Sequence, residues 1–599
     1  MNLPMLNDIP TSRQMVNVFG GYNHNLRIGD GEFYDMKNLS SDKYPVLSPR
    51  GKRGTIISYA PNVDGYGDDI TALTSKDGLW YVRENALYKD GDKIADLRAL
   101  NTRRSIASMG AYLIVMPDKF YINTAKTDLN GNYVESGSLT VWLWCSPLVW
   151  ELCDAEGKVY DSYAVGNDAP NLDENPVTVW LDTSGENASL KSYDDKKEQW
   201  VKIPYFTRVT ANGIREEEGS FFDLNEGDSV HLGFEAKFTE EQYRVEGTYS
   251  IKKIDKEESW LVIDAYVTSP IIAFGEITRT VPTMDFIIES GNRLWGCCYD
   301  AKIGRNEIYA SALGDFKNWN KFDGVSTDSY AASVGSDGAF TGAINHLGYP
   351  IFFKENCIHK VFGSYPANYQ IQTTNCRGVQ AGSEKSLAIV NETLFYKSRS
   401  AVCAYDGSLP QEISTPLGET RYSNAAAGAL GNKYYISMKM ENSSPEKYQL
   451  FVFDTAKGLW HKEDDTQATE FSNVNGILYY VDYADNTIKT VNGVGNILED
   501  DIEWSATTGI LETDSPDKKY ISRMDVRVSL AIGARMTFYI EYDSSESWEY
   551  LFSVEGTSLR TFPIPVRPKR CDHFRLKIEG KGDGKIHSIC KTIEQGSDA

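Results

Sequence analysis

The feature that most constrains this chain is a short sequence pattern that recurs seven times. Each copy has a turn rich in Gly, Asn or Asp, an aromatic-rich apolar strand, a second turn and a second strand. The copies begin at Asp77, Gly110, Gly291, Leu347, Asn391, Gly431 and Asn475. The last four starts are separated by 44, 40 and 44 residues. A period of about 40–50 residues with several short strands per unit is typical of β-propeller blades.

A single blade cannot bury both of its faces, so blades stack on their neighbours until the ring closes. We therefore predict an all-β fold built on a propeller of about seven blades. The composition agrees, because 12% aromatic residues and 49 Gly suit a turn-rich β-protein. No long amphipathic helix is expected anywhere in the chain.

A chain of 599 residues is longer than one core normally supports, and the repeats divide it. The second and third copies are too far apart for blade spacing, which predicts an inserted β-sandwich or barrel-like domain. Period-2 patterning at Met524–Leu530 and Phe574–Ile578 predicts a C-terminal β-sandwich of jelly-roll type. The predicted boundaries are an extended N-terminal arm at 1–54, propeller at 55–125, the insert at 126–280, propeller at 281–498 and the sandwich at 499–599.

The insert contains the apolar run SLTVWLWCSPLVWELC, which carries Trp142, Trp144 and Trp150. One interpretation is a membrane-active or partner-binding segment. Pro147 interrupts the run and the run is short for a membrane span, so core strands of the inserted domain are favoured.

Motifs for catalysis are absent from the sequence. There is no GxSxG, HExxH, GxxxxGK[ST] or GxGxxG, and the seven His and nine Cys show no metal-ligand spacing. Ser336-Asp337-Gly338 and Asp454–Trp460 are the nearest matches to sialidase-type Asp boxes, and neither fits. We therefore expect a protein that is not an enzyme and that needs no cofactor and no metal, with its Cys as buried free thiols. A glycan-cleaving propeller with two carboxylates remains an alternative.

The formal net charge of −23 argues against a protein that grips nucleic acid by its phosphates. It is compatible with an acidic wall that DNA slides past, and equally with a surface that keeps the protein soluble. Two basic clusters, Arg50–Arg53 and Arg567–Arg570, are either subunit contacts or ordinary solvated charges. The sequence shows neither a secretory signal nor a membrane span.

The arm carries FGGYNHNLRIGDGEFYDMKNLSSDKYPVLSPRGKRG, and this segment resembles the opening of tail hub proteins of tailed bacteriophages, also called nozzle or head–tail stabilization proteins. The C-terminal PIPVRPKRCDHFRLKIEGKGDGKIHSI also resembles the closing domain of such proteins. The insert has no match in this family. The matching residues of the arm are Phe19, Gly21, Tyr22, Asn23, Ile28, Asp30, Glu32, Asn38, Leu39, Pro45, Leu47, Arg50 and Arg53.

The resemblance implies a structural virion protein made in the bacterial host cytoplasm. It would form a ring, expected to be a hexamer, below the phage portal and adaptor, through which genomic DNA passes without sequence-specific binding. A receptor- or glycan-binding tail protein is the alternative, with exposed aromatic residues of the insert as its platform. The arm is expected to lie against the propeller or an adjacent subunit, and its expected subunit-contact residues are Phe19, Tyr22, Phe33, Tyr44, Arg50 and Arg53.

Overall fold

The computed structural model describes residues 11–57, 70–98, 103–173, 177–185, 188–511, 518–567 and 569–595. Residues 1–10 of the predicted arm and Pro568 of the second basic cluster lie outside these ranges. Contacts divide the chain into two compact units. The first is Met1–Arg103, Ser336–Val361 and Ile371–Ala599, and the second is Arg104–Gly335 with Phe362–Gln370.

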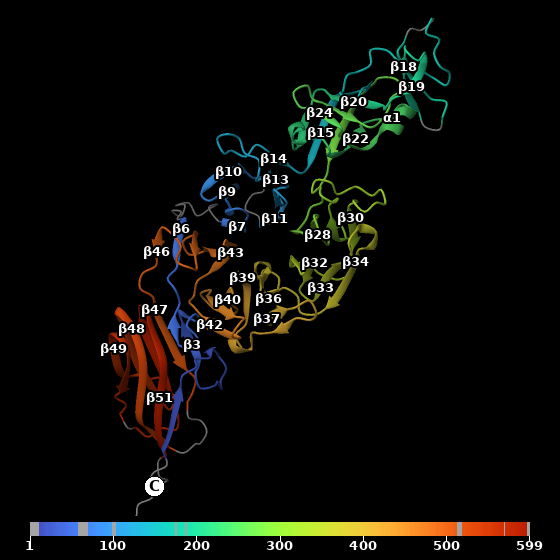
Figure 1. The fold of residues 1–599 in the computed structure, drawn as a ribbon. Coiled ribbons are helices and arrows are strands. Elements are labelled where there is room, and N and C mark those ends of the chain that lie inside the picture. Colours follow the sequence, from blue (N-terminus) through green and yellow to red (C-terminus); the bar gives the residue numbers. More distant parts are fainter. Residues whose placement is uncertain are drawn as a thin grey trace, which may run out of the picture. The chain divides into compact units, whose positions relative to one another are not determined.

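Strands dominate both units, and the longest helix within the described ranges is α1 (Glu240–Val245). The predicted all-β, propeller-type fold is confirmed, because each sequence repeat forms the two middle strands of a blade-like antiparallel sheet (Figure 1). The repeats therefore mark the centre of every blade. Turn and strand alternation are local properties, so the sequence alone reveals them.

Five of these sheets lie in the first unit and two in the second. The four-stranded sheets of the first unit are β7–β10 (Ile70–Ser75, Leu79–Arg83, Ala86–Lys89, Asp92–Asp96), β31–β34 (Gly342–His346, Tyr349–Lys354, Cys357–Phe362, Gln370–Asn375), β35–β38 (Ala388–Val390, Thr393–Lys397, Val402–Tyr405, Gln411–Glu412) and β39–β42 (Tyr422–Leu430, Lys433–Met440, Tyr448–Asp454, Leu459–Lys462). Those of the second unit are β11–β14 (Ser105–Met109, Tyr112–Met116, Phe120–Asn123, Ser136–Ser138) and β27–β30 (Phe286–Glu289, Leu294–Asp300, Arg305–Ala310, Tyr330–Ser333).

The last blade is completed by a strand from the N-terminal part of the chain. Its order is β43 (Ala468–Val474), β44 (Ile477–Asp482), β45 (Thr487–Thr490), β6 (Gly54–Ile57) and β46 (Ile497–Leu498). β6 lies antiparallel between β45 and β46, so residues more than 400 positions apart share one sheet. The same blade also packs on the first blade, where Val481 and Ile488 meet Leu79 and Tyr81 in one core.

Two-residue turns fix the register of the blade hairpins. Asn475 and Gly476 join β43 to β44 with φ values of 51° and 81°. Both lie in the left-handed region that a type I′ turn requires, and Asn and Gly reach that region at little cost. Asp90 and Gly91 play the same part between β9 and β10, with φ values of 49° and 108°. The turns rich in Gly, Asn and Asp that the repeats predict are confirmed at these two positions.

The insert is built from two sheets in the second unit. The eight-stranded sheet contains β15 (Val141–Cys153), β20 (Phe206–Ala211), β21 (Arg215–Glu218), β22 (Ser229–Phe234), β23 (Gly247–Ser250), β24 (Lys253–Asp255), β25 (Trp260–Ile263) and β26 (Ile271–Arg279). The second sheet contains β16 (Ala164–Gly166), β17 (Val179–Asp182), β18 (Ser189–Asp194) and β19 (Gln199–Lys202). Leu181 and Leu190 of the small sheet share a core with Trp150 and Leu152 of the large one, as in a sandwich.

The C-terminal strands form one sheet together with strands of the arm. The sheet comprises β1 (Thr11–Val16), β2 (Gly21–Tyr22), β3 (Glu32–Lys37), β47 (Glu503–Thr508), β48 (Lys519–Tyr542), β49 (Glu549–Ile564), β50 (Phe574–Lys581) and β51 (Gly584–Gln595). β48 is the spine, with β49 along one edge and β50 followed by β51 along the other (Figure 1). β3 pairs with β47, and β1 pairs with β51. The arm and the C-terminal segment are therefore a single folded element.

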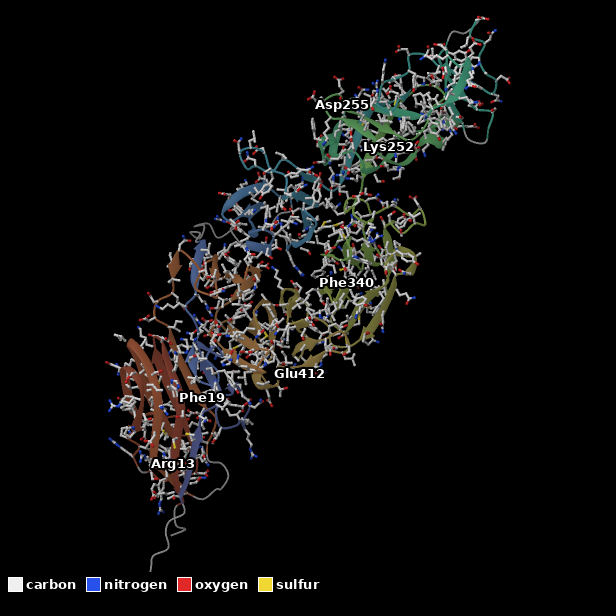
Figure 2. All side chains as sticks on the ribbon, in the orientation of Figure 1. Arg13, Phe19, Lys252, Asp255, Phe340 and Glu412 are labelled. Carbon is white, nitrogen blue, oxygen red and sulfur yellow. The ribbon has the colours of Figure 1, made fainter. Side chains whose placement is uncertain are left out.

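One hydrophobic core connects the arm, the C-terminal sheet and the blade β39–β42. Phe19, which is labelled in Figure 2, and Phe33 come from the arm. Phe451 and Trp460 come from the blade, and Ile578 comes from the sheet. The three segments meet because the apolar alternate positions of each strand are on the same buried side.

We expect Phe33→Ala to loosen the arm, because Phe33 is fully buried in this core. Removing a buried Phe ring costs about 3–5 kcal/mol. Urea unfolding monitored by hydrogen exchange over residues 19–57 measures the effect. Leu26→Ala is the matched control in the same arm, since Leu26 is 89% exposed and its truncation should change stability by less than about 0.5 kcal/mol. Equal protection in the two variants would contradict the arm's place in the core.

Candidate functional site

The arm residues that carry the family resemblance make contacts within their own chain. The Phe19 and Phe33 rings stack with centroids 6.0 Å apart, and the Tyr22 ring lies 5.5 Å from that of Phe451. Gly21 has φ of 86°, and a Cβ placed there would come within 2.5 Å of the carbonyl oxygen of Trp460. Glycine at this position therefore lets the arm backbone press against the last strand of the blade β39–β42.

Polar residues of the same motif pair with one another. Asn23 Nδ2 donates to Glu32 Oε2 at 3.0 Å, and the backbone N–H of Gly29 donates to the same oxygen at 2.7 Å. Farther along the arm, Arg50 Nε donates to Asn38 Oδ1 at 2.9 Å. Since a buried polar group without a partner costs free energy, these pairs explain why the motif combines amides, a carboxylate and a guanidinium.

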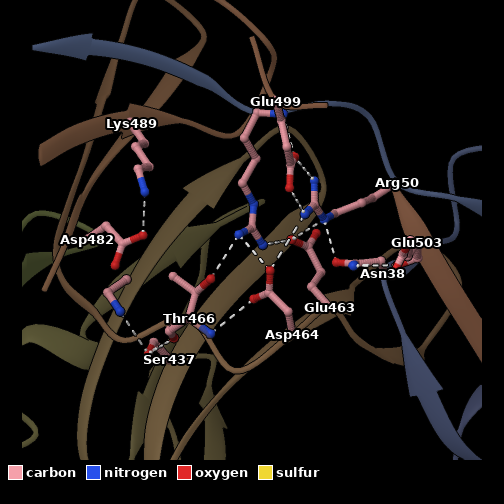
Figure 3. Close-up of polar contacts among 12 residues, drawn as sticks. Asn38, Arg50, Ser437, Glu463, Asp464, Thr466, Asp482, Lys489, Glu499 and Glu503 are labelled. Atoms are coloured by element: carbon pink, nitrogen blue, oxygen red, sulfur yellow. Dashed lines mark hydrogen bonds and ion pairs between the residues drawn. The ribbon is translucent and has the colours of Figure 1, made fainter. Parts of the chain in front are cut away.

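Two arginines of the arm form a buried ion-pair network with carboxylates far along the chain. Arg50 donates to both carboxylate oxygens of Glu499, from Nη1 at 2.7 Å and from Nη2 at 2.8 Å (Figure 3). Arg53 donates to Asp464 at 2.8 Å and to Glu463 at 2.6 Å. We call these five residues the arm lock. They lie just after β5 (Ser48–Pro49), β42 and β46, so the lock joins the arm to two blades.

The geometry of the arm lock favours charged side chains. Arg50, Arg53 and Glu463 are almost completely buried, and a bidentate guanidinium–carboxylate pair is the strongest hydrogen-bonded ion pair in proteins. Burial alone would raise the pKa of Asp464, but the charges of Arg53 and Arg50 and a hydrogen bond from Thr466 outweigh it and lower that pKa. Burial would likewise raise the pKa of Glu499, but the hydrogen bond and the charge of Arg50 outweigh burial and lower that pKa.

Of the two expected places for the arm, the propeller or an adjacent subunit, the structure shows contacts with the chain's own blade β39–β42. Phe19, Tyr22 and Phe33 are buried in the chain's own core, and Arg50 and Arg53 are buried in the arm lock. Their side chains are therefore not on the surface that another subunit would meet. Tyr44 differs, since it is 41% exposed, and its subunit contact stays a prediction.

The basic clusters are divided by the fold. In the first, Arg50 and Arg53 face inward, whereas Lys52 makes an exposed pair with Asp501 at 2.9 Å. In the second, Arg567, Lys569 and Arg570 are exposed. The buried arginines Arg50 and Arg53 are therefore neither solvated charges nor part of a surface patch. The spacing of basic residues in the sequence does not show that these two side chains are buried.

Sequence reasoning missed the partners of the arginines. Glu463 and Asp464 follow Trp460 in the segment GLWHKEDD, and Glu499 lies in the segment ILEDD. The one local signal for these partners is the pair of acidic residues, Glu463 and Asp464, directly after a strand. Their meeting with arginines more than 400 residues earlier is long-range information that no local pattern carries.

Carboxylates elsewhere in the first unit are also paired with cations. Glu470 on β43 binds Lys385, and Glu384 binds Arg103 at 2.6 Å. Burial lowers the pKa of Lys385 to about 8. Within the described ranges, no three His, Cys, Asp or Glu side chains gather in a group that would hold a metal ion. The nine Cys are free thiols, seven of them buried. No helix in the same ranges is long and apolar enough to cross a membrane.

Comparison with known proteins does not assign a family. No protein-family model and no curated protein sequence matches the chain. Among solved structures, the β-propeller domain of the Trilobed protease from Pyrococcus furiosus aligns at 10% identity and a TM-score of 0.25, over 54% of this chain and 95% of that one. An exo-β-1,3-galactanase from Phanerochaete chrysosporium aligns at 8% identity and a TM-score of 0.21, over 51% and 94% of the two chains. A sialidase from Trypanosoma rangeli aligns at 10% identity and a TM-score of 0.23, over 97% of this chain and 96% of that one. These scores carry no argument about activity.

We expect Arg53→Met to destabilise the first unit by about 3–5 kcal/mol, because the buried Glu463 and Asp464 lose their hydrogen-bonded cation and keep only Arg50, 3.6 Å from each. Lys52→Met is the matched control one residue earlier. Its exposed pair with Asp501 should be worth less than about 1 kcal/mol. Urea unfolding of both variants measures the difference. Equal stability would show that the arm lock contributes nothing.

The arm lock should also weaken in acid. The folded-state pKa values of Asp464 and Glu499 are lowered, so their contribution is fully present above the unfolded-state pKa of about 4. That contribution is lost as the pH falls through the lower folded-state values. We predict faster proteolysis of the arm below about pH 4, and less dependence on pH in Arg53→Met. Identical acid profiles would contradict the pairing.

Proposed function

We propose that this protein is a structural subunit of the tail or neck conduit of a tailed bacteriophage, of the tail hub or nozzle type. Copies would form a closed ring, a hexamer in our proposal, below the portal and adaptor, and the genome would leave through its channel. The observation that supports this most is the arm lock. The residues that resemble the phage family are those that bind the arm to blades and to the C-terminal sheet.

A conduit subunit must stay rigid while DNA passes under pressure, and the contacts of the first unit suit that task. Three strands of the arm are hydrogen-bonded into the C-terminal sheet, and β6 is hydrogen-bonded into the last blade. Pulling either element away would require breaking strand pairs and buried ion pairs at once. Heterologous contacts between such stiff bodies close into rings when the rotation between copies closes.

The charge of the chain supports passage of DNA without binding. A net charge of −23 repels phosphates, so a channel wall made of this protein would not hold the genome. Catalysis is not part of the proposal. The carboxylates Glu470 and Glu384 are tied to Lys385 and Arg103, which disfavours them as the free pair that a glycosidase requires.

A receptor- or glycan-binding tail protein is the second candidate. One observation favours it: Trp142 on β15 is 42% exposed on the insert. The sequence analysis placed this residue on a core strand together with Trp150. A register shift between Cys145 and Leu148 reverses the alternation of β15, so Trp150 points into the core while Trp142 points out of it. The run therefore forms a core strand as expected, with the Trp142 side chain on its exposed face.

Assembly distinguishes the two candidates. We expect the purified chain, alone or mixed with the portal and adaptor proteins encoded beside it, to reach the mass of a closed ring in multi-angle light scattering. Removing residues 1–50 should abolish the ring, because the C-terminal sheet then loses β1, β2 and β3. A chain that stays monomeric in every mixture and never joins a particle would contradict the proposal.

A further inference from the structure

The second unit contains a groove between the insert and the blade-like sheets on either side of it in the sequence. Its volume is about 620 Å³. Trp142 on β15 and Glu276 on β26 line it from the insert, and Arg305 on β29 lines it from the blade β27–β30. All of these elements belong to one compact unit, so the groove does not depend on how the two units are placed.

The indole of Trp142 is held as an open platform in this groove. Its Nε1 donates to Glu276 Oε2 at 2.9 Å, which fixes the plane of the ring. The facing position of β26 is Thr278, whose side chain also lines the groove, so no bulky residue covers the indole from the neighbouring strand. A half-exposed tryptophan on a central strand of a sheet is an unusual use of a large apolar side chain, since such rings are mostly buried.

An unpaired hydroxyl lies at the same place. Thr140, immediately before β15, lines the groove and is only 4% exposed. Its Oγ1 has no hydrogen-bond partner within the described ranges. Buried hydroxyls normally have a partner, so Thr140 adds unused hydrogen-bonding capacity beside the groove, which a ligand would reach by rotation of the Thr140 side chain.

The lining identifies the class of ligand. The charged side chains of the groove are Glu218 and Glu276 against Lys119 and Arg305, so their formal charges cancel. Hydroxyls and an amide surround them, including Thr280 and Asn320, which bond each other at 3.3 Å. A neutral ligand with many hydroxyls and one apolar face matches this chemistry. Phosphates would meet the two carboxylates, which disfavours an anionic ligand.

We propose that this groove binds a neutral oligosaccharide, with Trp142 stacking against the apolar face of one sugar ring. Glu276 is the positioning residue for the indole, and Thr140, Asn320 and the carboxylates bond sugar hydroxyls. The groove has room for a few sugar units, since binding sites of small ligands span about 300–1,000 Å³. This inference does not rest on the proposed ring, because binding requires only the second unit of the full chain.

The test uses the full-length protein on an array of neutral and anionic oligosaccharides, followed by isothermal titration calorimetry of the neutral sugars that bind. We expect a neutral oligosaccharide to bind with a Kd of about 1 mM or tighter. Trp142→Ala should weaken binding at least about ten-fold, the equivalent of about 1.4 kcal/mol for a lost stacking contact. Glu276→Ala should weaken binding as well, because the indole loses its fixed orientation.

Phe238→Ala is the matched control. Phe238 is 85% exposed on the same insert but does not line the groove, so its removal should leave binding unchanged. Far-UV circular dichroism and the unfolding midpoint test whether each variant is folded. If Trp142→Ala is not folded, the comparison uses Glu276→Ala in its place. The proposal is overturned if no neutral oligosaccharide binds the wild type, if only anionic ones bind, or if Phe238→Ala loses as much affinity as the groove variants.

Discussion

The first unit depends on the burial of two arginine side chains among carboxylates from distant strands. Arg50 and Arg53 extend from the arm to Glu463, Asp464 and Glu499, which pair with both guanidinium groups. Burying such ions is costly unless both the charges and the hydrogen bonds are satisfied. The arm can therefore occupy one path only, and this path leads its strands into the C-terminal sheet and β6 into the last blade.

Local pattern was enough to find the blades. The turns at Asn475 and Asp90 and the aromatic strands after them are specified within a few residues, so every repeat marked the middle of a real sheet. Local sequence patterns do not predict that the arm and the C-terminal segment share one sheet. Pairings such as β3 with β47 join residues more than 460 positions apart, and no periodicity encodes them.

The candidate site shows the same limit. The anchors Phe19, Tyr22 and Phe33 were correctly singled out as important, but their contacts proved to be within the chain. In the insert, one irregular pairing near Pro147 decides which tryptophans are buried. The apolar run looks uniform in sequence, yet the register shift changes which alternate positions are buried, so that Trp150 lies in the core and Trp142 lies at a groove. A one-residue change of register reverses every side chain beyond it.

These features fit a protein whose task is mechanical. The arm residues that resemble the phage family fasten the chain to itself, and the insert carries exposed aromatic side chains. The most direct test is electron cryo-microscopy of the phage particles to which we propose this chain belongs. The account predicts density for a closed ring of copies around the DNA channel, with the arm of each copy folded into its own sheet. Particles without the chain, or with isolated copies placed away from the channel, would contradict it.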